Sequence, residues 1–238
     1  MADELGVDQA MPILKKNRMS TGITDLDVIM EGGHQNPANI LLVGPSGTEK
    51  AVFAYHFAAA AGKNENTYII CGNTSPDDIV NKAANNGIDL NKENIKFIDC
   101  YSSTLGKGEI KSTPKVTLID GPSALNDISL ALNEAVKESQ GKRIRFVFDT
   151  FSTFVLYNPK DSIRKFLGVI EGRLKSANAT TLYLIDEGVH DKQLISLIEH
   201  GMDGKYLVVE KEGKFFLDIP GANTEIPIRV GPTGITVM

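Results

Sequence analysis

Short, nearly uninterrupted apolar segments alternate along this chain with longer segments in which apolar residues recur at helical spacing. A strand buried on both faces reads as a continuous apolar run, and its alternation with helices is typical of a parallel sheet covered by helices. The predicted strands are Asn39–Val43, Thr67–Cys71, Ile95–Asp99, Arg143–Asp149 and Thr180–Asp186. The predicted helices are Lys50–Ala61, Pro76–Asn86, Ala124–Ser139 and Asp161–Ser176. The pattern predicts an α/β fold with a mostly parallel central sheet.

The last part of the chain has a different pattern. Segments Lys205–Glu210 and Phe215–Ile219 flank the polar turn Lys211–Lys214, which is typical of an antiparallel hairpin. Ile226–Val230 and Ile235–Met238 predict a further pair of short strands. We therefore expect a C-terminal antiparallel hairpin to be added to the sheet.

The length of 238 residues suffices for one large α/β domain and is short for two ordinary ones. Residues 1–17 show little periodicity, so we expect an N-terminal arm followed by a single domain over residues 18–238. The segment Tyr101–Lys115 is rich in Ser, Gly, Thr and Lys and has no apolar face. It is predicted to be an exposed loop.

The charge balance argues against two classes of partner. Lys and Arg total 25 against 30 Asp and Glu, a formal net charge of −5, whereas nucleic acids and anionic membranes usually require a basic surface. No apolar stretch reaches membrane-spanning length, and the polar start is not a signal peptide. Cys71 and Cys100 are the two cysteines and lie in apolar runs, which argues against a disulfide scaffold. No histidine has metal-ligand spacing with them, which argues against a zinc site. We expect a soluble, cytoplasmic protein without a bound metal.

A glycine-containing loop lies between a predicted strand and a predicted helix. Its residues are Gly44, Pro45, Ser46, Gly47, Thr48, Glu49, Lys50 and Ala51. A phosphate loop has Gly, four residues, Gly-Lys and then Ser or Thr, so that backbone N–H groups and the lysine surround the phosphates. Gly44 and Lys50 match this pattern. These eight residues are the candidate nucleotide-binding segment.

Two positions of this loop depart from the pattern. Glu49 replaces the second glycine and Ala51 replaces the hydroxyl that would coordinate magnesium. At roughly 4 Å and an effective dielectric constant near 20, one contact between like charges costs about 4 kcal/mol. We therefore expect weakened nucleotide binding, and the segment could also be simply a glycine-rich turn.

Several motifs occur in a fixed order along the chain. They are Ser20–Asp27 followed by Glu31–Gly33, the loop Gly44–Lys50, the strand Arg143–Thr150, and Asp203–Gly204 before the predicted hairpin. In this order, from about Arg18 to Met238, they resemble the KaiC branch of the RecA-like ATPases, especially its single-domain archaeal members. The resemblance implies the RecA-like phosphate-loop NTPase fold, ATP and magnesium as ligands, and Asp149 as the Walker B aspartate. It also implies roles in signal transduction and assembly into rings or filaments.

The chain also departs from the family at two other places. The resemblance implies a pair of glutamates after the strand that follows the phosphate-loop helix, one of which activates water, but Asn73 and Thr74 stand there. A general base typically supplies 10²–10⁴-fold in rate. Active oligomers of the family also send a Lys-x-Arg pair to a neighbour's phosphates, and the matching stretch here is Asp218–Pro220. Such a cation acting in trans is worth on the order of 10³–10⁵-fold.

Four separate elements of the expected machinery are thus changed, and the sequence favours a protein without turnover and without a catalytic residue. We expect a regulatory or scaffolding partner that forms homo-oligomers or joins an active relative, with no obligatory cofactor. A slow ATPase or an ATP-binding sensor stays open because Lys50 and Asp149 are present. A recombinase-type DNA-binding protein also stays open, although the acidic balance argues against it.

Two acidic positions have more than one interpretation. Asp149 could hold magnesium or cap the turn that follows its strand. Asp186 and Glu187 end the next predicted strand at the same sheet edge, where ligands of open α/β sheets bind. They would supply a compensating acid or lie in a solvated loop.

Overall fold

The computed structural model describes residues 17–106, 111–220, 222 and 224–238, without the side chains of Thr48 and Glu49. The predicted N-terminal arm therefore lies outside the described residues, apart from Asn17. The strands are β1 (Arg18–Met19), β2 (His34–Gln35), β3 (Ala38–Gly44), β4 (Glu65–Cys71), β5 (Ile95–Asp99), β6 (Val116–Leu118), β7 (Arg143–Asp149), β8 (Ala179–Asp186), β9 (Gly204–Lys211), β10 (Lys214–Asp218), β11 (Ile226–Gly231) and β12 (Gly234–Val237). The helices are α1 (Thr24–Ile29), α2 (Thr48–Ala59), α3 (Pro76–Asn85), η1 (Ser102–Leu105), α4 (Leu125–Glu138), α5 (Phe151–Tyr157), α6 (Lys160–Ser176) and α7 (Lys192–Glu199).

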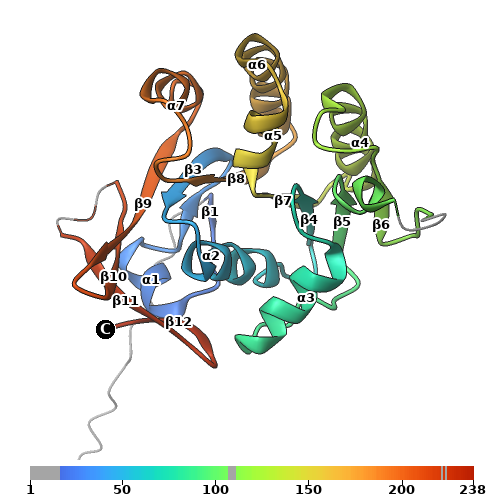
Figure 1. Cartoon of the computed structure of the whole chain (residues 1–238). Helices are drawn as coiled ribbons and strands as arrows, with labels where there is room; N and C mark the ends of the chain where they lie inside the picture. The colour runs from blue at the N-terminus through green and yellow to red at the C-terminus, as the bar shows by residue number, and fades with distance from the viewer. Residues whose placement is uncertain (1–16, 107–110, 221, 223) are drawn as a thin grey trace, which may run out of the picture.

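One large sheet forms the centre of the described part of the chain (Figure 1). Its strand order is β12-β11-β10-β9-β3-β8-β7-β4-β5-β6. The pairs from β9 to β6 are parallel, and β10, β11 and β12 continue the sheet in antiparallel pairing. This arrangement confirms the predicted α/β class, the mostly parallel sheet and the C-terminal hairpin.

Helices cover both faces of the sheet, as Figure 1 shows, with α2 and α3 on one side and α4 to α7 on the other. Each face has its own apolar cluster, which includes Phe53 and Phe57 of α2 on the first face and Phe166 of α6 on the second. Strand β3 is buried at every residue and β7 at every residue after Arg143, which is why the central strands read as largely apolar runs. Within the residues described, no helix is both long and apolar enough to cross a membrane.

Local sequence signals account for the ends of α3. Ser75 caps the helix, since its hydroxyl accepts a hydrogen bond from the Asp78 N–H at 3.2 Å, and Pro76 occupies the first turn. The helix ends at Asn85, and Gly87 follows with a φ of +70°. The bounds agree with the predicted helix Pro76–Asn86 to within one residue.

Some elements were not predicted. Helices α1, α5 and α7 and the short strands β1, β2 and β6 have no counterpart in the sequence-based assignment. The predicted loop Tyr101–Lys115 is wrong at its start, where η1 forms and Ser102 is buried; its described remainder, residues 111–115, has no helix or strand. Helix α5 escapes pattern reading because Phe151–Val155 are all buried, so the helix has no polar face to give a period.

The segment before the first buried strand is held by Asp27. Its carboxylate accepts hydrogen bonds from the Thr21 N–H at 2.6 Å, the Thr21 hydroxyl at 2.7 Å and the Ser20 hydroxyl at 2.5 Å. Gly22 has a φ of +83°, and a Cβ at that position would lie 2.2 Å from the carbonyl oxygen of His56. Only glycine fits there, so this segment packs directly against α2.

A buried charge cluster ties β4 to β7. The Glu65 carboxylate pairs with Arg143 and accepts hydrogen bonds from Nε and Nη2 of Arg145 at 3.0 and 2.8 Å. Arg145 is 1% exposed, and it also donates to the carbonyl oxygens of Ser20 and Phe57. Its guanidinium lies 4.7 Å from the centroid of the Phe57 ring. The cluster therefore supplies a counter-charge and hydrogen-bond acceptors to Arg145, a cation that is almost completely buried.

Glu65→Gln is expected to lower the free energy of unfolding by about 3–5 kcal/mol, because it leaves the buried Arg145 without its counter-charge. Chemical denaturation followed by circular dichroism would measure the loss. The matched control is Glu134→Gln, which breaks an exposed pair with Lys137 and should cost less than about 1 kcal/mol. Equal effects of the two substitutions would contradict the assignment.

Candidate functional site

A cavity of about 500 Å³ lies at the carboxyl edge of the parallel strands, bounded by α2, α3 and the ends of β7 and β8. Ligands of open α/β sheets bind at this edge. The predicted site residues that line the cavity are Ser46, Gly47, Lys50, Ala51, Asn73, Thr74 and Asp149. The tertiary structure thus brings together the loop, the position of the expected acids and the strand-end aspartate.

The remaining loop residues lie beside the cavity or are not described there. Gly44 ends β3, and a Cβ on it would lie 2.8 Å from Cβ of Val208, so the glycine permits close packing of the strand end. Pro45 lies in the turn that follows. Thr48 and Glu49 begin α2, but their side chains lie outside the described part of the structure.

Lys50 is held by the protein's own acceptors. Its ammonium group donates to Oδ1 of Asp186 at 2.6 Å, to the carbonyl oxygen of Ile185 at 3.0 Å and to that of Gly44 at 3.3 Å. The Lys50 side chain is 4% exposed, and the Asp186 side chain is 20% exposed. The ion pair therefore joins the first turn of α2 to the end of β8 at the floor of the cavity. Asp186 acts as the counter-ion of Lys50, and Glu187 is exposed.

Asp149 ends β7 as a buried carboxyl group. Oδ2 accepts a hydrogen bond from the Tyr55 hydroxyl at 3.4 Å. Burial raises the pKa of Asp149 to about 6, against the opposing positive charge of Lys82, whose influence exceeds that of Lys50. Burial, and then the charge of Asp149, raise the pKa of Tyr55. A buried carboxyl group whose pKa is raised in this way is typical of a functional site.

Asn73 and Thr74 follow β4 at the mouth of the cavity. Asn73 is exposed and Thr74 half-buried, and the Thr74 hydroxyl donates to Oδ1 of Asn73 at 3.1 Å. Both side chains are uncharged, so this part of the cavity wall carries hydrogen-bonding groups without an acid. Gly72 brings the strand end close to α5, because a Cβ there would lie 2.9 Å from the Thr150 carbonyl oxygen.

Sequence reading missed several residues of the cavity wall, among them Tyr55, Lys82, Asn85 and Asn86. The ring of Tyr55 of α2 is buried, and its hydroxyl reaches Asp149. Lys82, Asn85 and Asn86 come from the end of α3. A lysine and two asparagines near a helix end read as a solvated surface, so only the packing of α3 beside α2 reveals them.

A buried serine holds the end of β8 in place. The Ser152 hydroxyl accepts a hydrogen bond from the Asp186 N–H at 2.8 Å and lies 2.9 Å from Nε2 of His190. Ser152 is 1% exposed. Its hydrogen bond to the Asp186 N–H orients the end of β8, which carries the partner of Lys50. The 38-residue separation from His190 hid this contact from motif reading.

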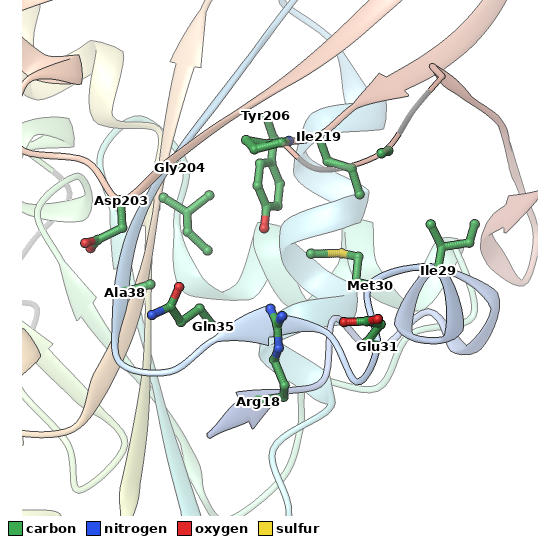
Figure 2. A pocket seen from close by; sticks show the side chains of 13 residues that line it. Arg18, Ile29, Met30, Glu31, Gln35, Ala38, Asp203, Gly204, Tyr206 and Ile219 are labelled. Atoms are coloured by element: carbon green, nitrogen blue, oxygen red, sulfur yellow. The ribbon is translucent and has the colours of Figure 1, made fainter. Parts of the chain in front are cut away.

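A second cavity of about 340 Å³ lies at the opposite end of β3 and β9, where these strands begin (Figure 2). Figure 2 shows Arg18 pointing into it below the ring of Tyr206. Two of its polar side chains already have protein partners: Arg18 donates to the Gly33 carbonyl oxygen and the Tyr206 hydroxyl contacts His34. Ile219 and Pro220, from the stretch where trans-acting cations were expected, line this cavity rather than the first.

Asp149→Asn is expected to stabilise the protein at pH 8 by about 2–3 kcal/mol, because the pKa in the folded state lies about 2 units above the usual 3.8. A pKa raised by folding means that wild-type stability rises as pH falls from about 6 towards 4. The advantage of the variant should therefore shrink over that interval. Denaturation midpoints from pH 4 to 8 would measure it, with the exposed Asp120→Asn as a control. A variant that is less stable than wild type at pH 8 would contradict the electrostatic account.

Comparisons with known proteins agree with this geometry. The family model described as "ATPase: KaiC" matches residues 19–213. A UPF0273 protein of Aeropyrum pernix is 25% identical over 215 residues, covering 88% of this chain and 81% of the relative. The circadian clock oscillator protein KaiC of Parathermosynechococcus lividus is 24% identical over 172 residues, covering 69% of this chain and 30% of that protein.

A solved structure, that of a KaiC-like protein from Pyrococcus horikoshii OT3, matches with a TM-score of 0.69 at 21% identity. The match covers 93% of this chain and 98% of the other, and at this identity it concerns the fold. With the family match over residues 19–213, it confirms the resemblance drawn from the motifs. The chain has the RecA-like α/β fold and belongs to the KaiC ATPase family.

Proposed function

We propose that this KaiC-family chain does not turn over ATP and acts as a regulatory or scaffolding partner in signal transduction. The observation that carries the proposal is that both carboxyl groups in the cavity wall already have protein partners. Asp186 is ion-paired with Lys50, and Asp149 is buried and hydrogen-bonded by Tyr55. Among the described residues that line the cavity, these are the acidic ones.

Hydrolysis of a phosphoanhydride needs a group that orients or deprotonates the attacking water. Asn73 and Thr74 stand where the family's glutamates were expected, and an amide or a hydroxyl does not accept a proton near neutral pH. Asp218–Pro220 offers no cation to a neighbouring subunit. Loss of either contribution alone is enough to make turnover slow.

The residues of the cavity do not fit the magnesium ion that the family implies. Magnesium takes near-octahedral oxygen coordination, with a hydroxyl after the loop lysine as one ligand. Ala51 has a methyl group there, and the Asp186 oxygen nearest the loop is bonded to an ammonium group. Asp149 is covered by Tyr55 and lies in the field of Lys82. A magnesium ion would therefore lack the ligands it needs among the described residues of this cavity.

The alternative is an ATP-binding sensor or a slow ATPase. It is favoured by the presence of Lys50 in a cavity large enough for a small ligand, next to the N-terminus of α2. A sensor would share the absence of turnover, whereas a slow ATPase would not. The likeness to a protein named as a circadian clock oscillator supports a regulatory role for either.

In a multiple-turnover assay with ATP and magnesium, phosphate release by the wild-type chain is expected to equal that of Lys50→Ala. The physical reason is the missing water-activating group. The assay should run at several protein concentrations, so that an assembled form is also sampled. Phosphate release that Lys50→Ala abolishes would overturn the proposal and favour the slow ATPase.

The double variant Glu49→Gly with Ala51→Thr is expected to bind ADP with magnesium at least tenfold more tightly than wild type. It removes a like charge from the loop and restores a metal-coordinating hydroxyl. Glu49→Gly with Ala51→Val is the matched control, because valine has the shape of threonine without its hydroxyl. Calorimetric titration would measure both. Neither variant should release phosphate from ATP, since Asn73 and Thr74 are unchanged.

We further propose that the chain forms homo-oligomers or joins an active relative, as the family resemblance implies. Support comes from Leu156 and Tyr157, adjacent apolar side chains at the end of α5 that are 63% and 65% exposed. Sedimentation velocity over a hundredfold range of concentration should reveal self-association, or association on mixing with a catalytically active member of the KaiC family. A monomer throughout, alone and mixed, would contradict this part of the proposal.

A further inference from the structure

Lys82 is the exposed cation of the proposed site. It lies near the end of α3 and lines the same cavity as Lys50. Within the described residues its ammonium group makes no hydrogen bond or ion pair, whereas the ammonium group of Lys50 is bonded to three protein acceptors. The cavity therefore keeps one cation whose N–H groups are available to a ligand.

The charge of Lys82 acts on Asp149, the residue that would be expected to hold a metal ion. It favours the ionised form of Asp149 more strongly than Lys50 does. In ordinary phosphate loops the aspartate at this strand end belongs to the magnesium site. Here the ammonium group of Lys82 takes part of that electrostatic role, and a divalent cation would have to enter the cavity against its like charge.

Apart from the carboxyl groups of Asp149 and Asp186, the second of which is paired with Lys50, the cavity wall carries hydrogen-bond donors that suit a phosphate. The N-cap of α2 is Gly47, which has no side chain to occupy the first free N–H groups of this 12-residue helix. Asn73, Asn85 and Asn86 add amide groups that can donate hydrogen bonds to oxygen. Donors from the helix end, the amides and one ammonium group thus face a common space.

We infer that this cavity binds a phosphate-bearing ligand without a divalent metal ion, with Lys82 supplying the positive charge that the metal supplies elsewhere. The inference rests on the proposed function, because a site that binds without turnover needs charge compensation but no metal-assisted chemistry. It assigns to Lys82 a direct contact with the phosphate, and it implies that Ala51 at the hydroxyl position does not abolish binding.

Calorimetric titration of the full chain with ADP, and separately with inorganic pyrophosphate, at pH 7.5 tests the inference. Each titration is run in EDTA and in magnesium. The dissociation constant should agree within about twofold between the two buffers. Binding of ADP alone would assign the ligand to nucleotides, and similar binding of both probes would assign it to the phosphate group itself. Binding of neither probe, or binding only with magnesium, would overturn the inference.

Lys82→Ala should weaken binding by about tenfold or more in both buffers, the loss typical of a charge-assisted hydrogen bond. Lys82→Arg keeps the charge and should bind within a few-fold of wild type. Lys137→Ala is the matched control, since it removes an exposed lysine of α4 that pairs with Glu134. Lys82 is exposed on its helix and alanine favours helices, so the variant should fold. Unchanged binding in Lys82→Ala would also overturn the inference.

The titrations use ADP and pyrophosphate in the absence of turnover, so they are independent of the phosphate-release assay. Phosphate release from ATP would defeat the proposed function while leaving a metal-independent, Lys82-dependent affinity for ADP measurable. A failure of the titrations with no phosphate release would defeat only the present inference.

Discussion

Strands β3, β7 and β8 run parallel in the middle of the sheet, so their carboxyl ends meet at one edge. Gly44, Asp149 and Asp186 end these three strands, and α2 begins after the first of them. The loop lysine, the strand-end acids and the residues after β4 consequently share one cavity, although they are far apart in the sequence. Burial on both faces fixes the register of these strands, because a shift by one residue would exchange the side chains that face each helical layer.

The two carboxylates at this edge are kept by different means. Asp186 gains an ammonium partner in Lys50, and Ser152 holds its backbone N–H. Asp149 is enclosed and has a phenol hydroxyl as its hydrogen-bond donor. A buried carboxylate lowers stability unless its charge is compensated, so such groups are concentrated at sites of binding. The cavity therefore combines a neutralised floor around Lys50 with an available cation, Lys82, on one wall.

Much of the fold could be predicted because the signals were strong and local. The bounds of β5 and β7 agree with the predicted strands, since both are apolar runs that are buried on two faces. The caps of α3 were also recognisable. Helix α5 and strand β6 were missed, the first because Phe151–Val155 are all buried and the second because it has only three residues, none of them fully buried.

The candidate site likewise combines residues that could be predicted from the sequence with contacts that could not. The loop pattern, and the family resemblance for Asn73, Thr74 and Asp149, assigned these residues to one nucleotide site before any contact was known. Nothing local predicted that Lys50 would be bonded to Asp186, 136 positions away, or that Lys82 would face the cavity. Those outcomes depend on how α3 packs beside α2 and how β8 ends next to β3.

The amino-acid sequence by itself determined the order of the elements, the family, and the chemical groups available at the cavity edge, because short-range patterns of burial and motif spacing encode them. Only the tertiary structure decided which of these groups neutralise one another and which are left for a ligand. The physical reason is that charge pairing depends on distances of a few ångströms between separate elements, and these are set by packing of the whole core rather than by neighbours along the chain.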